Sequence, residues 1–278
     1  MKVVVGPGQE PARLRHTLDA ELARAETDIH LSTDGISERA AAIEARALAA
    51  DLVSRVRRAR LLGSDVLSRR GELEEALRIQ LEMLTEAELD ADRLVCARAH
   101  CLLAATYDRL AEPGKALLAA EESVRLLAPG DPVLWAAEHM MVLALCTSYW
   151  RHGSVDYTTF DEALRLGREL GEPVLLLAIL NNYAYTALTH GDDHGAATVE
   201  EMRRIIRDEL SGRCPSAWLD TIAVGLLAAG RLDEAAEISA TAVALAPADL
   251  TEPTLVPMCI LTQAKIERAR GNLGAAAE

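Results

Sequence analysis

Aromatic residues are scarce in this 278-residue chain: they make up 3% of it, and Phe160 is the single phenylalanine. Alternation of apolar and polar residues over the length of a strand is also missing, and the β-branched run 3–5 is short. Alanine and leucine supply most of the apolar half of the chain. Because alanine packs closely and favours helix, this composition predicts an all-α protein of closely packed helices.

The chain also lacks a long apolar run, a C-x-x-C pair and a recognisable leader. Its first ten residues contain no apolar segment of the kind found in signal peptides. The longest apolar run, 174–180, is far shorter than the roughly 20 residues that cross a bilayer. The five cysteines are dispersed at positions 96, 101, 146, 214 and 259. We therefore expect a cytoplasmic protein with reduced thiols and no membrane association.

Positive charge is in deficit: 29 basic side chains face 43 acidic ones, giving a net charge of −14. A nucleic-acid-binding surface needs a net basic face, so this balance argues against nucleic acid as a partner. One local basic patch combines Arg55, Arg57, Arg58 and Arg60. We interpret it as a solvated helix face whose arginines pair with nearby acids.

A glycine followed five residues later by an alanine recurs along the chain. The pairs are Gly35 and Ala40, Gly71 and Ala76, Gly191 and Ala196, Gly230 and Ala235, and Gly271 and Ala276. Alanine replaces the glycine at Ala111, and a longer segment separates Gly153 from Ala163. These turn positions lie 36 to 42 residues apart. A steady period in this range predicts stacked helical hairpins, each with its turn at the glycine.

A small residue precedes most turns by seven positions, where it would face the alanine of the second helix. These residues are Ser64, Ala104, Cys146, Ala184, Ala223 and Ala264. The first hairpin carries Asp28 instead.

The pattern predicts a single repeat domain over 1–278, a superhelix (solenoid) of about seven hairpins. Residues 10–50 would form a degenerate first hairpin and 51–278 the following ones. Because arrays normally end in a capping helix, we expect the truncated last hairpin to belong to a longer protein.

This pattern of small residue, turn glycine and alanine resembles the tetratricopeptide repeat (TPR). The segment 230–247, with Ala235, Ala242 and Pro247, is the part most similar to that family's turn and second helix. The aromatic residues typical of the family are mostly missing, and the period exceeds its usual 34 residues. The length of the period also fits HEAT-type repeats, but the spacing from turn glycine to alanine favours the TPR.

A narrower resemblance concerns the order of the segments 65–76, 98–127, 179–197 and 218–235. This order resembles the N-terminal TPR region of actinobacterial signalling proteins in which a GGDEF diguanylate cyclase domain follows. No GGDEF motif occurs in this chain. The resemblance implies a regulatory, partner-sensing or dimerising role, and it allows the chain to form a homodimer. Any cyclase activity would lie outside the chain. The repeat region of a large transcriptional regulator is the alternative.

Two clusters could suggest metal chemistry. His190, Gly191, Asp192, Asp193 and His194 form an HGDDH sequence with potential ligands, but it coincides with a repeat turn in which the aspartates can cap the next helix. We interpret it as that turn.

Cys96 and His100 would share a helix face, with Cys101 adjacent. Zinc needs three or four ligands, so packing explains them better. No catalytic or phosphate-binding motif is present, and we expect neither an enzyme nor a cofactor.

The first helices of the hairpins are expected to line a concave groove that binds a protein or peptide partner. The TPR register places in it Arg58, Asp65, Arg69, Arg98, Cys101, Asp108, Arg109, Thr147, Trp150, Arg151, Asn181, Tyr185, Thr189, Asp220, Lys265 and Arg268. From these we select Arg109, Trp150, Arg151, Asn181, Tyr185 and Asp220 as the candidate partner-binding residues. They mix arginine with tryptophan and tyrosine, which are enriched at interface hot spots. The alternative is that they are merely solvated.

Overall fold

A computed structural model describes residues 10–152, 154–192, 194–212, 214–247, 255–272 and 274. These residues form helices and contain no strand, which confirms the all-α prediction for the part of the chain described. The helices are α1 (Glu10–Asp28), α2 (Ile36–Ala49), α3 (Val53–Arg69), α4 (Leu73–Leu89), α5 (Arg93–Arg109), α6 (Pro113–Arg125), α7 (Val133–Cys146), α8 (Tyr157–Leu170), α9 (Pro173–Thr189), α10 (His194–Glu209), α11 (Ser216–Ala228), α12 (Leu232–Leu245) and α13 (Leu255–Ala269), with a short π-helix, η1 (Thr147–His152), after α7.

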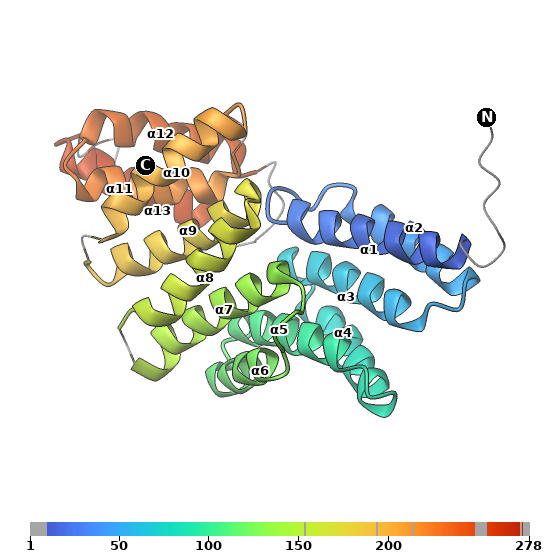
Figure 1. Cartoon of the computed structure of the whole chain (residues 1–278). Coiled ribbons are helices and arrows are strands. Elements are labelled where there is room, and N and C mark those ends of the chain that lie inside the picture. The colour runs from blue at the N-terminus through green and yellow to red at the C-terminus, as the bar shows by residue number, and fades with distance from the viewer. Residues whose placement is uncertain are drawn as a thin grey trace, which may run out of the picture.

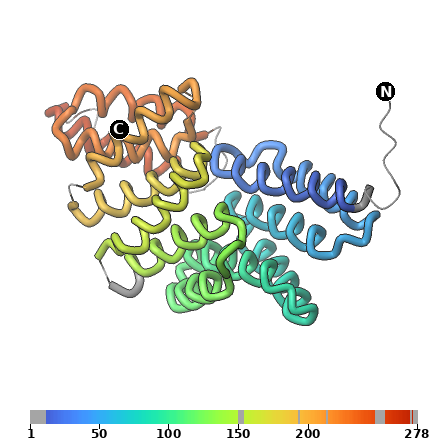
Figure 2. Tube along the Cα trace, viewed as in Figure 1, coloured from blue at the N-terminus to red at the C-terminus, as the bar shows by residue number. Residues whose placement is uncertain are grey.

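The helices are arranged in an arc. Each packs against the next along the chain, and each odd-numbered helix also contacts the next odd-numbered one. The arc runs from α1 and α2 through α5 and α6 to α11–α13 (Figure 1), and the tube in Figure 2 follows the same course. Its curvature brings α1 back into contact with α9. This packing of adjacent helices is consistent with a helical repeat.

The predicted turn positions share one backbone conformation. Five glycines have a positive φ, between 67° and 84°: Gly35, Gly71, Gly191, Gly230 and Gly271. Ala111, where alanine replaces glycine in the pattern, has the same left-handed conformation with φ 56°. The period read from the sequence therefore located equivalent turns. Gly153 lies outside the described residues.

Small residues are buried where paired helices approach. Ser64, Ala104, Cys146, Ala184 and Ala223 are all buried on the first helices, and Ala76, Ala116, Ala163 and Ala235 are fully buried on the second. Ala264 is only half-buried. At Asp28 the carboxylate pairs with Arg39 of α2 instead (2.7 Å). A charge pair thus takes the place of the small residue at this one position of the first hairpin.

The fifth hairpin departs from the predicted register. Ala196 is only half-buried, and Gly195 makes the close approach in its place. A Cβ atom at Gly195 would lie 2.6 Å from Leu188 Cγ and 3.0 Å from the carbonyl oxygen of Ala184. In this hairpin Gly195, and not Ala196, is therefore the residue that the first turn of α10 presents to α9.

The basic patch on α3 is paired with acids, as predicted, but it is not fully solvated. Arg55 pairs with Asp19, Arg57 with Glu86 and Asp90, Arg58 with Glu26, and Arg60 with Glu44. Arg57 is buried, and the side chain of Arg58 is nearly so. The interpretation as an open, solvated face is therefore wrong for these two residues.

Replacing Ala111 by glycine should stabilise the protein. A left-handed conformation costs an L-residue about 1–2 kcal/mol, and glycine removes that cost while adding some unfolded-state entropy. We expect Ala111→Gly to raise the free energy of unfolding by about 0.5–1 kcal/mol in urea titrations. Ala41→Gly is the matched control because Ala41 is exposed inside α2; it should destabilise by ~1 kcal/mol. Equal destabilisation by both would contradict the assigned turn.

The register of the fifth hairpin can be tested by a pair of reciprocal substitutions. Gly195→Ala should destabilise the protein by about 1–3 kcal/mol, because the new methyl group meets backbone and a packed side chain. Ala196→Gly should cost less than about 1 kcal/mol, the loss of helix propensity alone. Urea titration of both variants measures the difference. The opposite order of stabilities would restore Ala196 as the contact residue.

Candidate functional site

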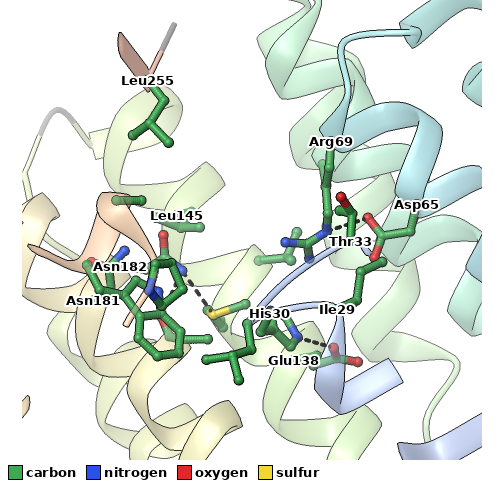
Figure 3. Close-up of a pocket in the computed structure, with 18 of the residues that line it drawn as sticks. Ile29, His30, Thr33, Asp65, Arg69, Glu138, Leu145, Asn181, Asn182 and Leu255 are labelled. Carbon is green, nitrogen blue, oxygen red and sulfur yellow. Dashed lines mark hydrogen bonds and ion pairs between the residues drawn. The ribbon is translucent and has the colours of Figure 1, made fainter. Parts of the chain in front are cut away.

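A cavity of about 350 Å³ lies on the inner side of the arc. Among the residues described, its lining comes from α3, α5, α7, α9, α11 and α13, with Pro215 at the start of α11 and the segment Ile29–Asp34 between α1 and α2. No described lining residue belongs to an even-numbered helix. Figure 3 shows this space, with Asp65, Arg69 and Glu138 on one side and Asn181 and Asn182 on the other.

Four of the six candidate residues line this cavity: Arg109, Asn181, Tyr185 and Asp220. The side chains of the other two, Trp150 and Arg151, lie outside what the structure describes. Of the wider groove set, the lining also includes Asp65, Arg69, Arg98 and Cys101, but not Arg58, Asp108, Thr147, Thr189, Lys265 or Arg268. The register therefore brings most of the chosen residues to one space, and their role in binding stays a prediction.

The α5–α7 wall holds a buried ion pair. Arg98 Nη1 donates to Glu138 Oε2 (2.5 Å), and His30 Nε2 donates to Glu138 Oε1 (2.7 Å). Arg98 and Glu138 are only 2% and 3% exposed. Burial alone would raise the pKa of Glu138, but the charge on Arg98 and the hydrogen bond from His30 lower it to about 2. Glu138 is therefore ionised at neutral pH and fixes both partners.

On the neighbouring wall, formed by α3, the buried carboxylate also has cationic partners. Arg69 Nε donates to Asp65 Oδ1 (3.0 Å). Burial would raise the pKa of Asp65, but the charges on Arg69, Arg98 and Arg109 outweigh it and lower that pKa. Arginines and carboxylates thus lie side by side at this end of the cavity. Nη2 of Arg98 nevertheless has no hydrogen-bond partner.

The end of α1 is tied to α3 and α7 by Glu26, which is 1% exposed. Arg58 donates two hydrogen bonds to its carboxylate (2.9 and 2.7 Å), and Trp135 Nε1 donates a third (3.1 Å). The Arg58 guanidinium lies over the Trp135 ring, 4.6 Å from its centroid. These contacts hold the segment 29–34 in the cavity wall. Glu26 and Trp135 are 109 residues apart, and no local sequence pattern signals their pairing.

At the opposite end of the cavity, on α9, α11 and α13, fewer of the buried polar atoms have hydrogen-bond partners. Asn182 Nδ2 donates to the Ala178 carbonyl oxygen (2.9 Å). In contrast, Oδ1 of Asn181 and Oδ1 of Asp220 have no hydrogen-bond partner, although both atoms are buried. Burial raises the pKa of Asp220, only partly opposed by a hydrogen bond from Thr262 and the charge on Lys265. Two acceptor oxygens are therefore left unsatisfied at this end.

The HGDDH segment behaves as a turn. His190 and His194 are exposed, and Asp192 Oδ1 accepts a hydrogen bond from the His194 backbone N–H (2.9 Å). Asp192 also accepts a hydrogen bond from the Tyr157 hydroxyl, while Asp193 lies outside the described residues. Asp192 thus caps α10, as predicted.

The cysteine and histidine pair on α5 does not form a metal site with the other described residues. Cys96 is buried and His100 half-buried, and burial raises the pKa of the Cys96 thiol. Among the residues described, no three His, Cys, Asp or Glu side chains come together in a way that could hold a metal ion.

The chain was compared with known proteins. No protein-family model matches it, and no curated protein matches it significantly. Within the described ranges, none of the helices combines the length and apolar character needed to cross a membrane.

Stability should fall in acid because of Glu138. Its pKa is lowered on folding, so its contribution is present above the unfolded value near 4.5 and is lost as pH falls toward 2. The shift corresponds to roughly 3 kcal/mol. Urea titrations from pH 6 to pH 3 should show roughly 2 kcal/mol of this loss in the wild type. Glu138→Gln should show a weaker pH dependence, and it is itself destabilised because Arg98 loses its partner.

Exposed Glu74 provides the control for this prediction. Glu74→Gln should keep the wild-type slope of unfolding free energy against pH. An unchanged slope in Glu138→Gln would show that the acid sensitivity has another origin.

Proposed function

We propose that the chain is a TPR-like superhelix of about seven hairpins, forming a single domain, whose inner face binds a peptide segment of a protein partner. The observation that carries this proposal is the cavity, which collects its described lining from the odd-numbered helices and the segment 29–34. This is the face on which stacked helical hairpins present side chains to a ligand. The four candidate residues that line it come from α5, α9 and α11.

The unsatisfied atoms in the cavity support a binding role. A buried polar atom without a hydrogen bond costs roughly 1–3 kcal/mol, and a bound ligand can remove that cost. Arg98 Nη2 is a donor, whereas Asn181 Oδ1 and Asp220 Oδ1 are acceptors. A peptide offers both backbone carbonyl and N–H groups, so it can satisfy atoms of both kinds.

The size of the cavity indicates what part of a partner enters it. About 350 Å³ is at the small end of ligand-binding pockets and fits a few side chains. A short peptide segment satisfies this limit, whereas a folded domain does not. Tyr185 contributes the kind of rigid aromatic surface that anchors peptides.

The wider context that we propose is regulation within a cytoplasmic signalling protein, in which the repeats control a GGDEF diguanylate cyclase domain. It is supported by the resemblance in the order of the repeat segments. The repeat region of a transcriptional regulator remains the second candidate. Light scattering of the purified chain would test the associated proposal of a homodimer.

Peptide binding can be tested with a random peptide library displayed on phage. Peptides selected on the wild-type chain should lose at least about tenfold in affinity for Tyr185→Ala and Asn181→Ala, by removal of cavity contacts. The same is expected of Trp150→Ala. Tyr107→Ala is the matched control, because Tyr107 is half-buried on α5 and does not line the cavity.

Thermal unfolding should show that the variants remain folded. Peptides that bind wild type, Tyr185→Ala and Asn181→Ala equally would place binding elsewhere and refute the proposal for this face.

A further inference from the structure

The cavity is electrically uneven from one end to the other. Arg69, Arg98 and Arg109 lie at the α3–α5 end, together with the carboxylates of Asp65 and, across on α7, Glu138. At the α9–α13 end, Asp220 is the one charged side chain among the lining residues that the structure describes. Positive charge is thus supplied by the protein at one end only.

Asp220 is in an unusual position for a carboxylate. It is 3% exposed, and its Oδ1 atom has no hydrogen-bond partner. Lys265 is close enough to affect its ionisation, but Lys265 is exposed and does not line the cavity. Burying a carboxylate is costly unless it is paired. A cationic group in the cavity would supply the missing partner.

A second unsatisfied acceptor lies on the neighbouring helix. Oδ1 of Asn181, on α9, is buried and unpartnered, and α9 packs directly against α11, which carries Asp220. Both residues line the same cavity. Two acceptor oxygens suit a group with several N–H donors, such as an ammonium or a guanidinium.

The walls at this end are apolar and aromatic. Tyr185, Trp218, Leu255 and Met258 line the space, and Trp218 and Leu255 are buried. Figure 3 shows Leu255 on the same side of the cavity as Asn181. Such walls can cover the methylene stem of a lysine or arginine side chain while its charged end reaches a polar partner.

We propose that the α9–α13 end of the cavity binds an ammonium or guanidinium group on an aliphatic stem, held by Asp220 and Asn181. Within the proposed peptide-binding function, on which this inference rests, the group is a lysine or arginine side chain of the partner. A free alkylamine has the same chemistry. The net charge of −14 would attract such a basic partner.

The test uses isothermal titration calorimetry with three probes of similar shape. N-acetyl-lysine amide carries the ammonium group on its stem, N-acetyl-norleucine amide carries the stem without the charge, and n-pentylamine is the free amine. The lysine probe should bind at least about tenfold more tightly than the norleucine probe. Equal affinity of these two probes, or binding of neither, would overturn the inference.

Two variants assign the effect to the carboxylate. Asp220→Asn should weaken binding of the lysine probe at least about tenfold, whereas Asp161→Asn, at an exposed position of α8, should leave it unchanged. Asp220→Asn should also not lower the thermal unfolding midpoint, because burial disfavours the charged form of the carboxylate that it removes. Retained binding by Asp220→Asn contradicts the assignment.

The library-selected peptides separate this inference from the proposed function. Replacing their lysines by norleucine should reduce affinity for wild type but not for Asp220→Asn. If peptide binding depends on Tyr185 but not on a basic residue or on Asp220, the cation site is wrong and peptide binding stands. If n-pentylamine binds and no peptide does, the site accepts free amines and the peptide-binding function is wrong.

Discussion

Two helices can approach closely only where both carry small side chains, and this constraint organises the whole chain. Ser64 and Ala76 are buried on α3 and α4, and Ala104 and Ala116 lie in one buried cluster between α5 and α6. A left-handed turn residue between them, such as Gly71 or Ala111, reverses the chain within a few residues. Repetition of this unit puts every second helix on the same side of the arc, which is why the cavity draws its lining from odd-numbered helices.

The sequence was informative where the determinant is local. Turn positions and the small residues facing them follow from spacing, since a glycine or alanine at a fixed offset has the same role in each hairpin. The same register selected Asn181, Tyr185 and Asp220, which the structure brings to one cavity. The spacing was wrong by one residue in the fifth hairpin, where it selected Ala196 but Gly195 makes the close approach to α9.

The repeat pattern in the sequence could not predict contacts between residues that are far apart along the chain. Glu26, His30, Trp135 and Glu138 occupy no repeated position, and their contacts join residues more than 100 positions apart. The burial of Arg57 and Arg58 was missed for the same reason, since an arginine-rich helix face has the same sequence whether acids or water surround it. Charged side chains thus lie both on exposed helix faces and in buried pairs that join distant helices, and only the structure distinguishes the two.

The tie between α1 and α7 changes how the array can unfold. In a stack whose units contact only their neighbours, stability is close to one-dimensional, and an end can fray without disturbing the middle. Glu26 and His30 connect the first hairpin directly to α7, three hairpins further along. This closes a large loop of chain, whose entropy must be lost before the contact forms. The hairpins inside the loop are therefore expected to unfold together with the contact between α1 and α7. The N-terminal half should then open as one cooperative unit.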